Sequence, residues 1–293
     1  MLSMNSRPQS DRESFPAALS ERERLLFETR KQVIEDILLY QIRNFYHRHE
    51  MSGKTVLDFG CGIGTSTVIM AKAYPDVHFV GVELDASLVE IGTRIQADER
   101  LSNVEFFSSP DGDHLPDEIA HSAFDMIMLS AVYEHLLPQE RTKLIPQLWQ
   151  RLKIGGRLFF NQTPHSWFPF EHHSTGLWFV NYLPDKLAHK VAMTWGKLNK
   201  SISNSPNWNI QLRGGIRGGS ERMVLKNITD CGGSAKIVQP SIGSRDRAEY
   251  WLFQTSRKLY ILKKVIALLF RVTDRTFGVV PSINMDLVVE KRS

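Results

Sequence analysis

The sequence predicts an α/β fold in which helices cover both faces of a mostly parallel sheet. Short apolar runs recur along the chain with helical patterns between them, which is the alternation of a doubly wound sheet. A chain of 293 residues is also long enough to bury a substantial core. Its hydrophobic fraction of 42% and charged fraction of 23% are ordinary for a globular protein.

The apolar runs give the positions of the strands. Strands are expected at residues 55–59, 78–83, 104–107, 124–129 and 157–161. Helices are expected at residues 17–50, 65–73 and 139–152, and from about residue 85. Just after Asp85, the spacing of Ser87 and Glu90 is typical of a capping box. Pro146 predicts a kink or a break in its helix, because proline has no amide proton to donate.

The alternation of strand and helix patterns ends after residue 161, and this change divides the chain into predicted segments. Residues 162–219 are rich in aromatic residues, histidine, glycine and asparagine, which favours an irregular cap. The core pattern resumes with a helix at 220–230 and strands at 235–238 and 283–289. The predicted segments are a disordered tail (1–16), an α/β core (17–165), a cap (166–219), a continuation of the core (220–240), a second insertion with a basic amphipathic helix (241–282) and a last core strand (283–293).

Composition and charge exclude several classes of protein. The formal net charge is +4 and the charges are scattered, so a nucleic-acid partner is not expected. Two cysteines, Cys61 and Cys231, do not make a disulfide framework and fit a reducing compartment. The polar start of the chain lacks a signal-peptide pattern, and no apolar run reaches the roughly 18 residues of a membrane span. We therefore expect a cytoplasmic protein.

The strongest local pattern is a glycine-rich turn directly after the first strand. Gly60, Gly62 and Gly64 follow the apolar run 55–59 at alternate positions, and a helical pattern comes next. Glycine permits a tight turn and lets backbone N–H groups approach a ligand without interference from Cβ. In open α/β sheets such a turn lies at the carboxyl edge of the strands, where ligands bind.

An acidic residue ends the second strand and narrows the class of ligand. Glu83 can accept hydrogen bonds from both ribose hydroxyls, so the two features fit either a nicotinamide dinucleotide or S-adenosylmethionine. Position 65 is Thr65, so the G-x-G-x-x-G spacing of dinucleotide binders is not met.

Three later segments complete an ordered series. Asp111 and Gly112 follow the third strand, Glu134-His135-Leu136 follows the fourth, and a Gly155-Gly156 pair introduces the fifth. The series resembles the class I S-adenosylmethionine-dependent methyltransferases, especially the bacterial-type group with a Glu-His-Leu segment after strand four.

The resemblance covers roughly residues 50–165, with a continuation in residues 220–240 and 283–291. It implies a Rossmann-like, seven-stranded, mostly parallel sheet with helices on both faces and inserted cap segments. It also implies that the core at 17–165 binds the cofactor and that the cap at 166–219 covers the substrate.

The resemblance further implies a set of contacts with S-adenosylmethionine at the carboxyl edge of the sheet. The implied residues are Asp58, Gly60, Gly62, Gly64, Glu83, Asp111, Gly112 and Ser130. The three glycines would wrap the methionine part, and Asp58 would hold its amino group directly or through water. Glu83 would take the ribose hydroxyls and Asp111 the adenine amine. Ser130 and Ala131 would line the pocket near the methyl sulfonium.

Methyl transfer to a hydroxyl uses a general base, and histidine titrates near neutrality. The candidate catalytic residues are His135, after strand four, and His172 and His173 in the cap. His135 can equally shape the cofactor pocket. No metal site is expected, because Glu171 and the two cap histidines are adjacent and lack the helical spacing of ligand pairs.

Aromatic residues of the cap can form an apolar pocket that excludes water, or they can form the core of the cap itself. The predicted substrate-binding residues are His165, Trp167, Phe170, Trp178 and Arg217. Arg213 and Arg217 flank a glycine-rich segment, and two guanidinium groups can hold an anionic acceptor such as a phosphate or uronate. The alternative for this segment is a flexible hinge.

Two basic amphipathic stretches, at 186–200 and 257–272, suggest peripheral contact with a membrane. In the second stretch Leu262, Ile266 and Leu269 are expected on one face. The alternative is that both stripes pack against their own domain.

The sequence thus predicts an enzyme that transfers a methyl group from S-adenosylmethionine to a hydroxyl or amine of a small-molecule, glycan or lipid-linked acceptor, leaving S-adenosylhomocysteine. The alternatives are a non-catalytic partner subunit that binds S-adenosylmethionine and, less favoured, a nicotinamide-dependent oxidoreductase. Ser130-Ala131-Val132-Tyr133 stands where nucleic-acid methyltransferases carry an Asn/Asp-Pro-Pro-aromatic tetrapeptide.

Overall fold

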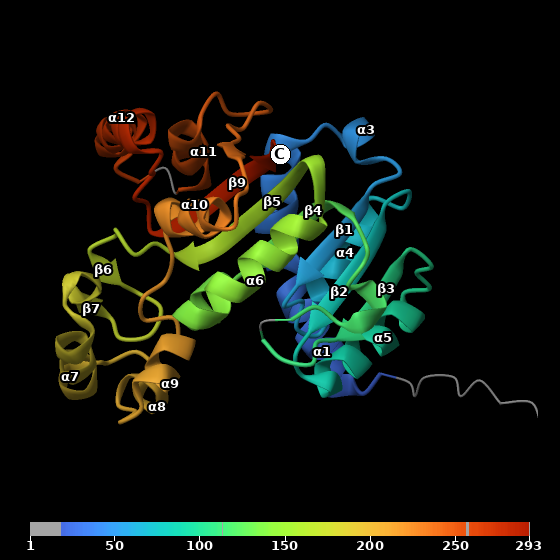
Figure 1. Ribbon diagram of the computed structural model, residues 1–293, viewed down its shortest axis with the longest axis horizontal. Helices are drawn as coiled ribbons and strands as arrows, with labels where there is room; N and C mark the ends of the chain where they lie inside the picture. The colour runs from blue at the N-terminus through green and yellow to red at the C-terminus, as the bar shows by residue number, and fades with distance from the viewer. Residues whose placement is uncertain (1–18, 113, 256–257, 293) are drawn as a thin grey trace, which may run out of the picture.

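The computed structural model describes residues 19–112, 114–255 and 258–292, so the tail predicted at 1–16 lies outside the described residues (Figure 1). A seven-stranded sheet forms its centre. The strands are β1 (Thr55–Phe59), β2 (His78–Glu83), β3 (Val104–Ser108), β4 (Phe124–Ser130), β5 (Leu152–Pro164), β8 (Ala235–Ile237) and β9 (Asn284–Lys291). Their order across the sheet is β3-β2-β1-β4-β5-β9-β8. Strands β1 to β5 pair in parallel and β9 is antiparallel to both neighbours, so the predicted fold class is confirmed.

Side chains alternate between the two faces of this sheet, because successive residues of a strand point in opposite directions. Val56 and Phe79 belong to a core on the face covered by α1 (Glu21–Ile34), α4 (Thr65–Ala73) and α5 (Ala86–Asp98). Leu57 and Val80 belong to the core on the other face, under α6 (Pro138–Arg151) and α10 (Glu221–Asp230). Both faces of the central strands are therefore buried, which explains why these strands are apolar throughout.

The helical stretch predicted at 17–50 is divided into four pieces. They are α1, η1 (Glu35–Leu39), α2 (Tyr40–Phe45) and α3 (Arg48–Met51). The η1 segment is a π-helical turn. Such turns are often found at functional sites, because the wider turn redirects the side chains that follow.

Two details of the predicted helices differ in the structure. Helix α5 is capped by Asp85, whose carboxylate accepts from the Ser87 backbone N–H at 2.9 Å, so the predicted capping box of Ser87 and Glu90 is wrong. Helix α6 continues through Pro146, so the helix is not broken there.

The chain after β5 forms two groups of elements at one side of the sheet (Figure 1). The first contains β6 (Phe170–Glu171), β7 (Leu177–Trp178), η4 (Val180–Tyr182), α7 (Asp185–Trp195), α8 (Lys200–Ser203) and α9 (Trp208–Arg213). The second contains α11 (Arg247–Gln254) and α12 (Tyr260–Phe277), which lie between β8 and β9 in the sequence. Their assignment as cap and second insertion stays a prediction. None of the helices in the described part of the chain is long and apolar enough to cross a membrane.

Candidate active site

The glycine-rich turn after β1 has the backbone conformation that only glycine adopts without strain. Gly60 and Gly64 have φ values of +78° and +75°. A Cβ atom on Gly60 would lie 2.5 Å from the Val132 side chain, and one on Gly64 would lie 2.6 Å from Phe106. The turn is therefore fixed both by its dihedral angles and by close packing against β3 and the end of β4.

Glu83, at the end of β2, is hydrogen-bonded to this turn. Its Oε2 accepts from the Gly62 backbone N–H at 2.8 Å, and its Oε1 accepts from the Leu84 backbone N–H at 2.7 Å. The carboxylate thus lies at the junction of two strand ends, where parallel sheets bind their ligands.

A cavity of about 230 Å³, the cofactor cavity, opens at this edge of the sheet. Its walls contain Gly60, Glu83, Asp111, Gly112 and His135, which are predicted site residues from four separate strand ends. The Asp111 carboxylate also contacts His114 Nδ1 at 2.8 Å. The structure therefore brings together the residues expected at the ribose and adenine of S-adenosylmethionine.

A neighbouring cavity of about 540 Å³, the loop cavity, lies between the glycine turn and helix α1. Its walls include Gly60 and Ala131, which also line the cofactor cavity, and Ser130 and Gln162 from the ends of β4 and β5. Arg30 of α1 lines it as well and would lie 3.7 Å from a Cβ on Gly62. A guanidinium here suits the carboxylate of a methionine moiety. Sequence reasoning missed Arg30, because no local pattern joins it to the turn.

Asp58, expected to hold the amino group of the cofactor directly or through water, lies buried at the end of β1, and that role stays a prediction. Its carboxylate is buried and accepts from the Ser66 and Thr67 hydroxyls at 2.6 and 2.8 Å. It lines neither cavity. Burial raises the pKa of Asp58, although both hydroxyl groups oppose this shift. Asp58 therefore links the end of β1 to the start of α4 and stabilises the glycine turn between them.

His135 lies beside Glu134 and His173 where the cap meets the core. His135 Nδ1 is 2.6 Å from the Arg213 carbonyl oxygen, and its Nε2 is 3.8 Å from Glu134 Oε1. Both ring nitrogens thus face protein groups, an arrangement that favours a role in shaping the pocket over that of a base. The Glu134 carboxyl is buried and its Oε1 has no hydrogen-bond partner. One ligand atom from each of Glu134, His135 and His173 lies within 4.8 Å of the others.

The two cap histidines proposed as bases, His172 and His173, are not among the residues that line the cofactor cavity. Burial lowers the pKa of His172 and of His173. The His173 ring lies 5.3 Å from that of His135, centroid to centroid, whereas His172 lies close to Asn284. The structure therefore does not bring the three predicted bases together at one point, and their catalytic role stays a prediction.

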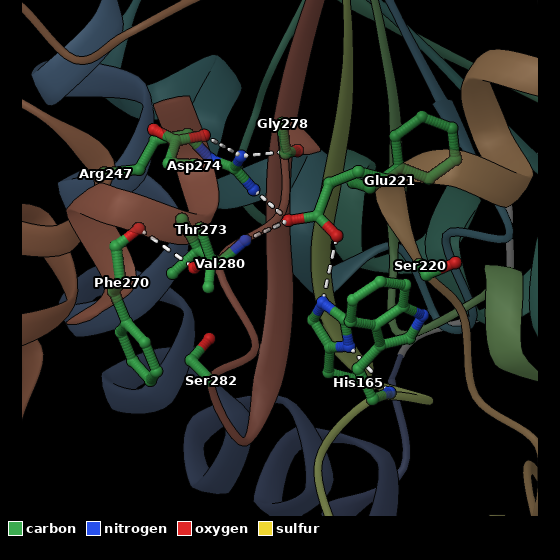
Figure 2. A network of polar contacts seen from close by, with 12 residues as sticks. His165, Ser220, Glu221, Arg247, Phe270, Thr273, Asp274, Gly278, Val280 and Ser282 are labelled. Atoms are coloured by element: carbon green, nitrogen blue, oxygen red, sulfur yellow. Dashed lines mark hydrogen bonds and ion pairs between the residues drawn. The ribbon is translucent and has the colours of Figure 1, made fainter. Parts of the chain in front are cut away.

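His165 is a buried structural residue rather than a substrate contact. Its Nδ1 accepts from the Trp167 backbone N–H at 3.0 Å, and its Nε2 donates to Glu221 at 2.9 Å (Figure 2). Glu221 also pairs with Arg247, which contacts Asp274 at 3.0 Å. Both ring nitrogens are thereby used, so the predicted role of His165 in binding an acceptor is wrong.

The other predicted substrate residues of the cap also bind within the protein. Arg217 donates to the carbonyl oxygens of Val180, Asn181 and Leu183 at 2.8 to 3.1 Å, and it pairs with Asp185. Trp178 is 62% exposed and stacks on Phe170, while Trp167 lies under Arg222. His165, Trp167, Phe170, Trp178 and Arg217 line neither cavity, whereas Arg213 lines the cofactor cavity. Arg217 therefore stabilises the cap itself, whereas the substrate role of the cap aromatics stays a prediction. Arg213 likewise pairs with Glu140 instead of standing free for an anion.

Comparisons with known proteins agree with this geometry. Residues 57–158 match a family described as a methyltransferase domain. An uncharacterized methyltransferase of Anoxybacillus flavithermus is 32% identical over 39% of this chain and 49% of its own length. Phosphoethanolamine N-methyltransferase 1 of Triticum aestivum is 30% identical over 46% of this chain and 24% of its own. The chain thus spans less than half the length of both relatives.

Among solved structures, an O-methyltransferase family protein from Burkholderia thailandensis is similar with a TM-score of 0.47 and 14% identity, over 76% of this chain and 55% of that one. The matched residues 57–158 carry the glycine turn, Glu83 and strands β2 to β4. This part of the chain is a class I S-adenosylmethionine-dependent methyltransferase domain, as predicted. S-adenosylmethionine is accordingly its cofactor, and the described walls fit it: a glycine cradle without room for Cβ, a carboxylate at the ribose position and a guanidinium at the other end.

Proposed function

We propose that the protein transfers a methyl group from S-adenosylmethionine to a hydroxyl or amine of a small-molecule, glycan or lipid-linked acceptor. The observation that carries the proposal is the meeting of two cavities at Gly60 and Ala131. One cavity has the acidic wall suited to a nucleoside, and the other holds space beside it at the ends of β4 and β5. Together the two cavities offer room for the nucleoside and the methionine part of the cofactor, next to the ends of β4 and β5.

S-adenosylmethionine, when bound, supplies a methyl group already activated by a sulfonium. The residues of this chain therefore need mainly to hold and align. Glu83 and the glycine turn would fix the nucleoside end, and Arg30 the carboxylate end. Alignment of this kind contributes about 7–11 kcal/mol to rate acceleration in well-oriented reactions.

Transfer of label tests the proposal. Purified protein would be incubated with methyl-labelled S-adenosylmethionine and a bacterial lysate, and the lipid, polar, polymer and protein fractions would then be counted. We expect label in one fraction and its loss in Glu83→Ala, because the ribose contact disappears. Glu90→Ala, at an exposed position of α5, is the matched control and should keep the label.

The second candidate is a partner subunit that binds S-adenosylmethionine without turnover. His135 Nδ1 is 2.6 Å from the Arg213 carbonyl oxygen and its Nε2 is 3.8 Å from Glu134 Oε1, and this engagement of the histidine by protein groups favours the second candidate. Binding of S-adenosylhomocysteine with no label in any fraction would support this candidate and contradict the enzyme.

A further inference from the structure

A third cavity, the strand-end cavity, lies beyond Gln162 on the side away from the nucleoside wall. Its volume is about 450 Å³. Gln162 lines both this cavity and the loop cavity, so the two spaces are neighbours across one residue. The described lining residues come from the π-helical region, β5, α11 and β9: Asp36, Ile37, Tyr40, Gln162, Trp251, Phe253, Gln254, Thr255, Ser282, Ile283, Asn284 and Asp286.

The backbone is strained where the two cavities meet. Ala131 and Gln162, directly after β4 and within β5, have φ values of +54° and +58°, a region that residues with a Cβ rarely adopt. Strain of this kind persists where surrounding contacts enforce it, and it is concentrated at functional sites. Here the Ala131 N–H donates to the Asn161 carbonyl at 2.8 Å, and the Gln162 N–H donates to Asp286 Oδ1 at 3.2 Å.

A chain of polar groups joins the loop cavity to Asp286. The Ser130 hydroxyl donates to Asn161 Oδ1 at 3.1 Å, and Asn161 Nδ2 lies 3.5 Å from Asp286 Oδ1. Asp286 is a carboxylate within a strand of the central sheet, a place that disfavours aspartate. Within the described residues no basic side chain forms an ion pair with Asp286, and Arg247 attracts it only at longer range. Burial raises the pKa of Asp286 to about 6, although the Gln162 N–H opposes this shift.

The remaining walls indicate the chemistry of a ligand. Ile37, Tyr40, Trp251 and Phe253 supply apolar and aromatic surface. Two carboxylates, Asp36 and Asp286, face the space, and none of its described lining residues is basic. Such walls accept a neutral or cationic group and repel an anion.

We propose that the strand-end cavity binds the methyl acceptor, an uncharged alcohol or an amine with an apolar or aromatic body, and that Asp286 receives the proton of the attacking group. This proposal rests on the proposed methyl transfer. In the step, the acceptor oxygen or nitrogen forms a bond to the methyl carbon, the carbon–sulfur bond breaks with its electron pair left on sulfur, and the acceptor proton passes to the Asp286 carboxylate and then to water.

Several charged or titratable groups face Asp286 from the elements packed around it, and its protonation depends on them. They are Asp36 of η1, Tyr40 of α2, Glu221 of α10, and Arg247 and Tyr250 of α11. Arg247 favours the charged carboxylate, whereas Glu221 opposes it. The carboxylate form, which accepts the proton, therefore prevails above about pH 6.

The charge preference of the strand-end cavity can be tested with three probes of similar shape. They are phenethylamine, a cation; 2-phenylethanol, which is neutral; and 3-phenylpropionate, an anion. Their binding would be followed by quenching of tryptophan fluorescence, with Trp251→Phe identifying the reporting ring. We expect the amine and the alcohol to bind and the carboxylate to fail. Binding of the amine should weaken about tenfold as the pH falls from 7 to 5, since one charge–charge contact of about 1.4 kcal/mol is lost.

Two variants separate this proposal from the proposed function. Asp286→Asn should abolish the preference for the amine and lower label transfer at least tenfold, while S-adenosylhomocysteine binds as before. Phe253→Ala should weaken all bound probes, and Phe277→Ala, also 51% exposed but outside the cavity, should not. The proposal would be overturned if 3-phenylpropionate bound as well as the amine and the alcohol, or if Asp286→Asn transferred the label as well as wild type. If the wild-type protein did not bind S-adenosylhomocysteine at all, the proposed function itself would be contradicted.

An independent observation concerns the outer face of α12. Ile261, Val265, Leu268, Leu269 and Val272 are 54 to 82% exposed. Ile266, Ala267 and Phe270 face the protein instead, so the face expected from the sequence is only partly right: Leu262 and Leu269 point outward and Ile266 inward. The helix is held firmly, because Asp274 is bound to the Arg247–Glu221–His165 network (Figure 2).

Basic residues flank this apolar face. Lys264, Arg271 and Arg275 are seven and four residues apart and therefore lie in one row along the helix, in which Arg271 is paired with Asp246 at 2.6 Å. The helix carries four basic residues and one acidic residue, and that acid is paired with Arg247. A further hollow at Leu252, Phe253, Thr255 and Tyr260 connects the start of α12 with the wall of the strand-end cavity.

We infer that the outer face of α12 docks on an anionic membrane surface, with its apolar side chains among the lipid tails and its basic row at the headgroups. This orientation places the strand-end cavity beside the bilayer. By contrast, α7 ends at Trp195, so the other basic stretch, predicted at 186–200, is not one continuous helix.

Vesicle sedimentation tests this inference, with phosphatidylcholine alone and phosphatidylcholine mixed with phosphatidylserine. We expect binding to the mixed vesicles only, its loss at high salt, and at least a tenfold reduction in Ile261→Asp/Leu268→Asp. Leu25→Asp, a 68% exposed leucine of α1, is the matched control and should bind normally. Binding to neither vesicle, together with a dimer that Ile261→Asp/Leu268→Asp dissociates in light scattering, would overturn the inference in favour of a second copy of the chain.

Discussion

The two halves of the sheet, β3-β2-β1-β4 and β5-β9-β8, position the residues of the site in different ways. In the first half, the ligand-facing residues directly follow the strands that position them, as Gly60 and Glu83 do. In the second half, Gln162 and Asp286 are more than a hundred positions apart and meet only because β9 runs antiparallel to β5. Local sequence patterns therefore describe the cofactor side, whereas sheet topology creates the acceptor side.

The largest predicted effect concerns the network that holds the second half together. Glu221→Gln should lower the free energy of unfolding by about 3–5 kcal/mol, because buried Arg247 loses one of its two carboxylate partners and keeps only Asp274. Asp230→Asn, which removes the exposed partner of Lys226, should cost at most about 1 kcal/mol. Urea unfolding measures both. Similar losses in the two variants would mean that the network does not stabilise this half.

The same network predicts acid sensitivity. Burial opposes the charge of Glu221, but the His165 hydrogen bond and the Arg247 charge hold its pKa at about 2. The folded pKa is thus below that of the unfolded chain, so the stabilisation is present above the unfolded value and is lost as the pH falls toward 2. Unfolding curves of wild type and Glu221→Gln should therefore converge at low pH.

The next prediction concerns the glycine turn in the cofactor-binding half of the sheet. Gly60→Ala should weaken binding of S-adenosylhomocysteine at least tenfold, or about 1.4 kcal/mol, since its Cβ would strike Val132 in a left-handed backbone. Gly53→Ala has a similar φ of +69° but nothing within 4 Å of its Cβ, so it controls for backbone strain alone. Calorimetric titration distinguishes them. If both bound the ligand equally well, close packing at the turn would not be required.

A further prediction concerns Arg30 of α1, which we expect to contact the carboxylate of the ligand beside the glycine turn. Arg30→Ala should weaken binding of S-adenosylhomocysteine by about 1–2 kcal/mol, because a charge-assisted contact with the ligand carboxylate is lost. Arg22→Ala, at an exposed position of the same helix, should have no effect. An unchanged affinity in Arg30→Ala would place the methionine end elsewhere.

The last expected effect is a gain of stability in Asp286→Asn. Burial raises the folded pKa of Asp286 to about 6, so the penalty on the folded state begins as the pH rises past the unfolded pKa of about 4 and is complete above about 6. The variant should unfold at a higher temperature than wild type at pH 8, by a smaller margin at pH 5, and at nearly the same temperature at pH 3. A destabilised variant at pH 8 would show that the carboxylate serves the fold.

The sequence predicted the strands β1 to β4 nearly residue for residue, because each is a short apolar run that ends at a turn or a polar residue. It located Gly60, Glu83 and Asp111 for the same reason. It could not separate the roles of the cap residues, since exposed aromatics such as Trp178 and buried histidines such as His165 are indistinguishable by composition. Their burial and hydrogen bonds decide their roles, and these depend on contacts distant in sequence.

The most direct test compares two measurements on one pair of proteins. Wild type and Asp286→Asn would each be titrated with S-adenosylhomocysteine and then assayed for transfer of labelled methyl to lysate fractions. We expect the two proteins to bind S-adenosylhomocysteine with equal affinity. Methyl transfer by Asp286→Asn should be lower by about 10²–10⁴, the usual contribution of a proton acceptor. Equal affinities with undiminished transfer in Asp286→Asn would contradict the role of Asp286 as the proton acceptor.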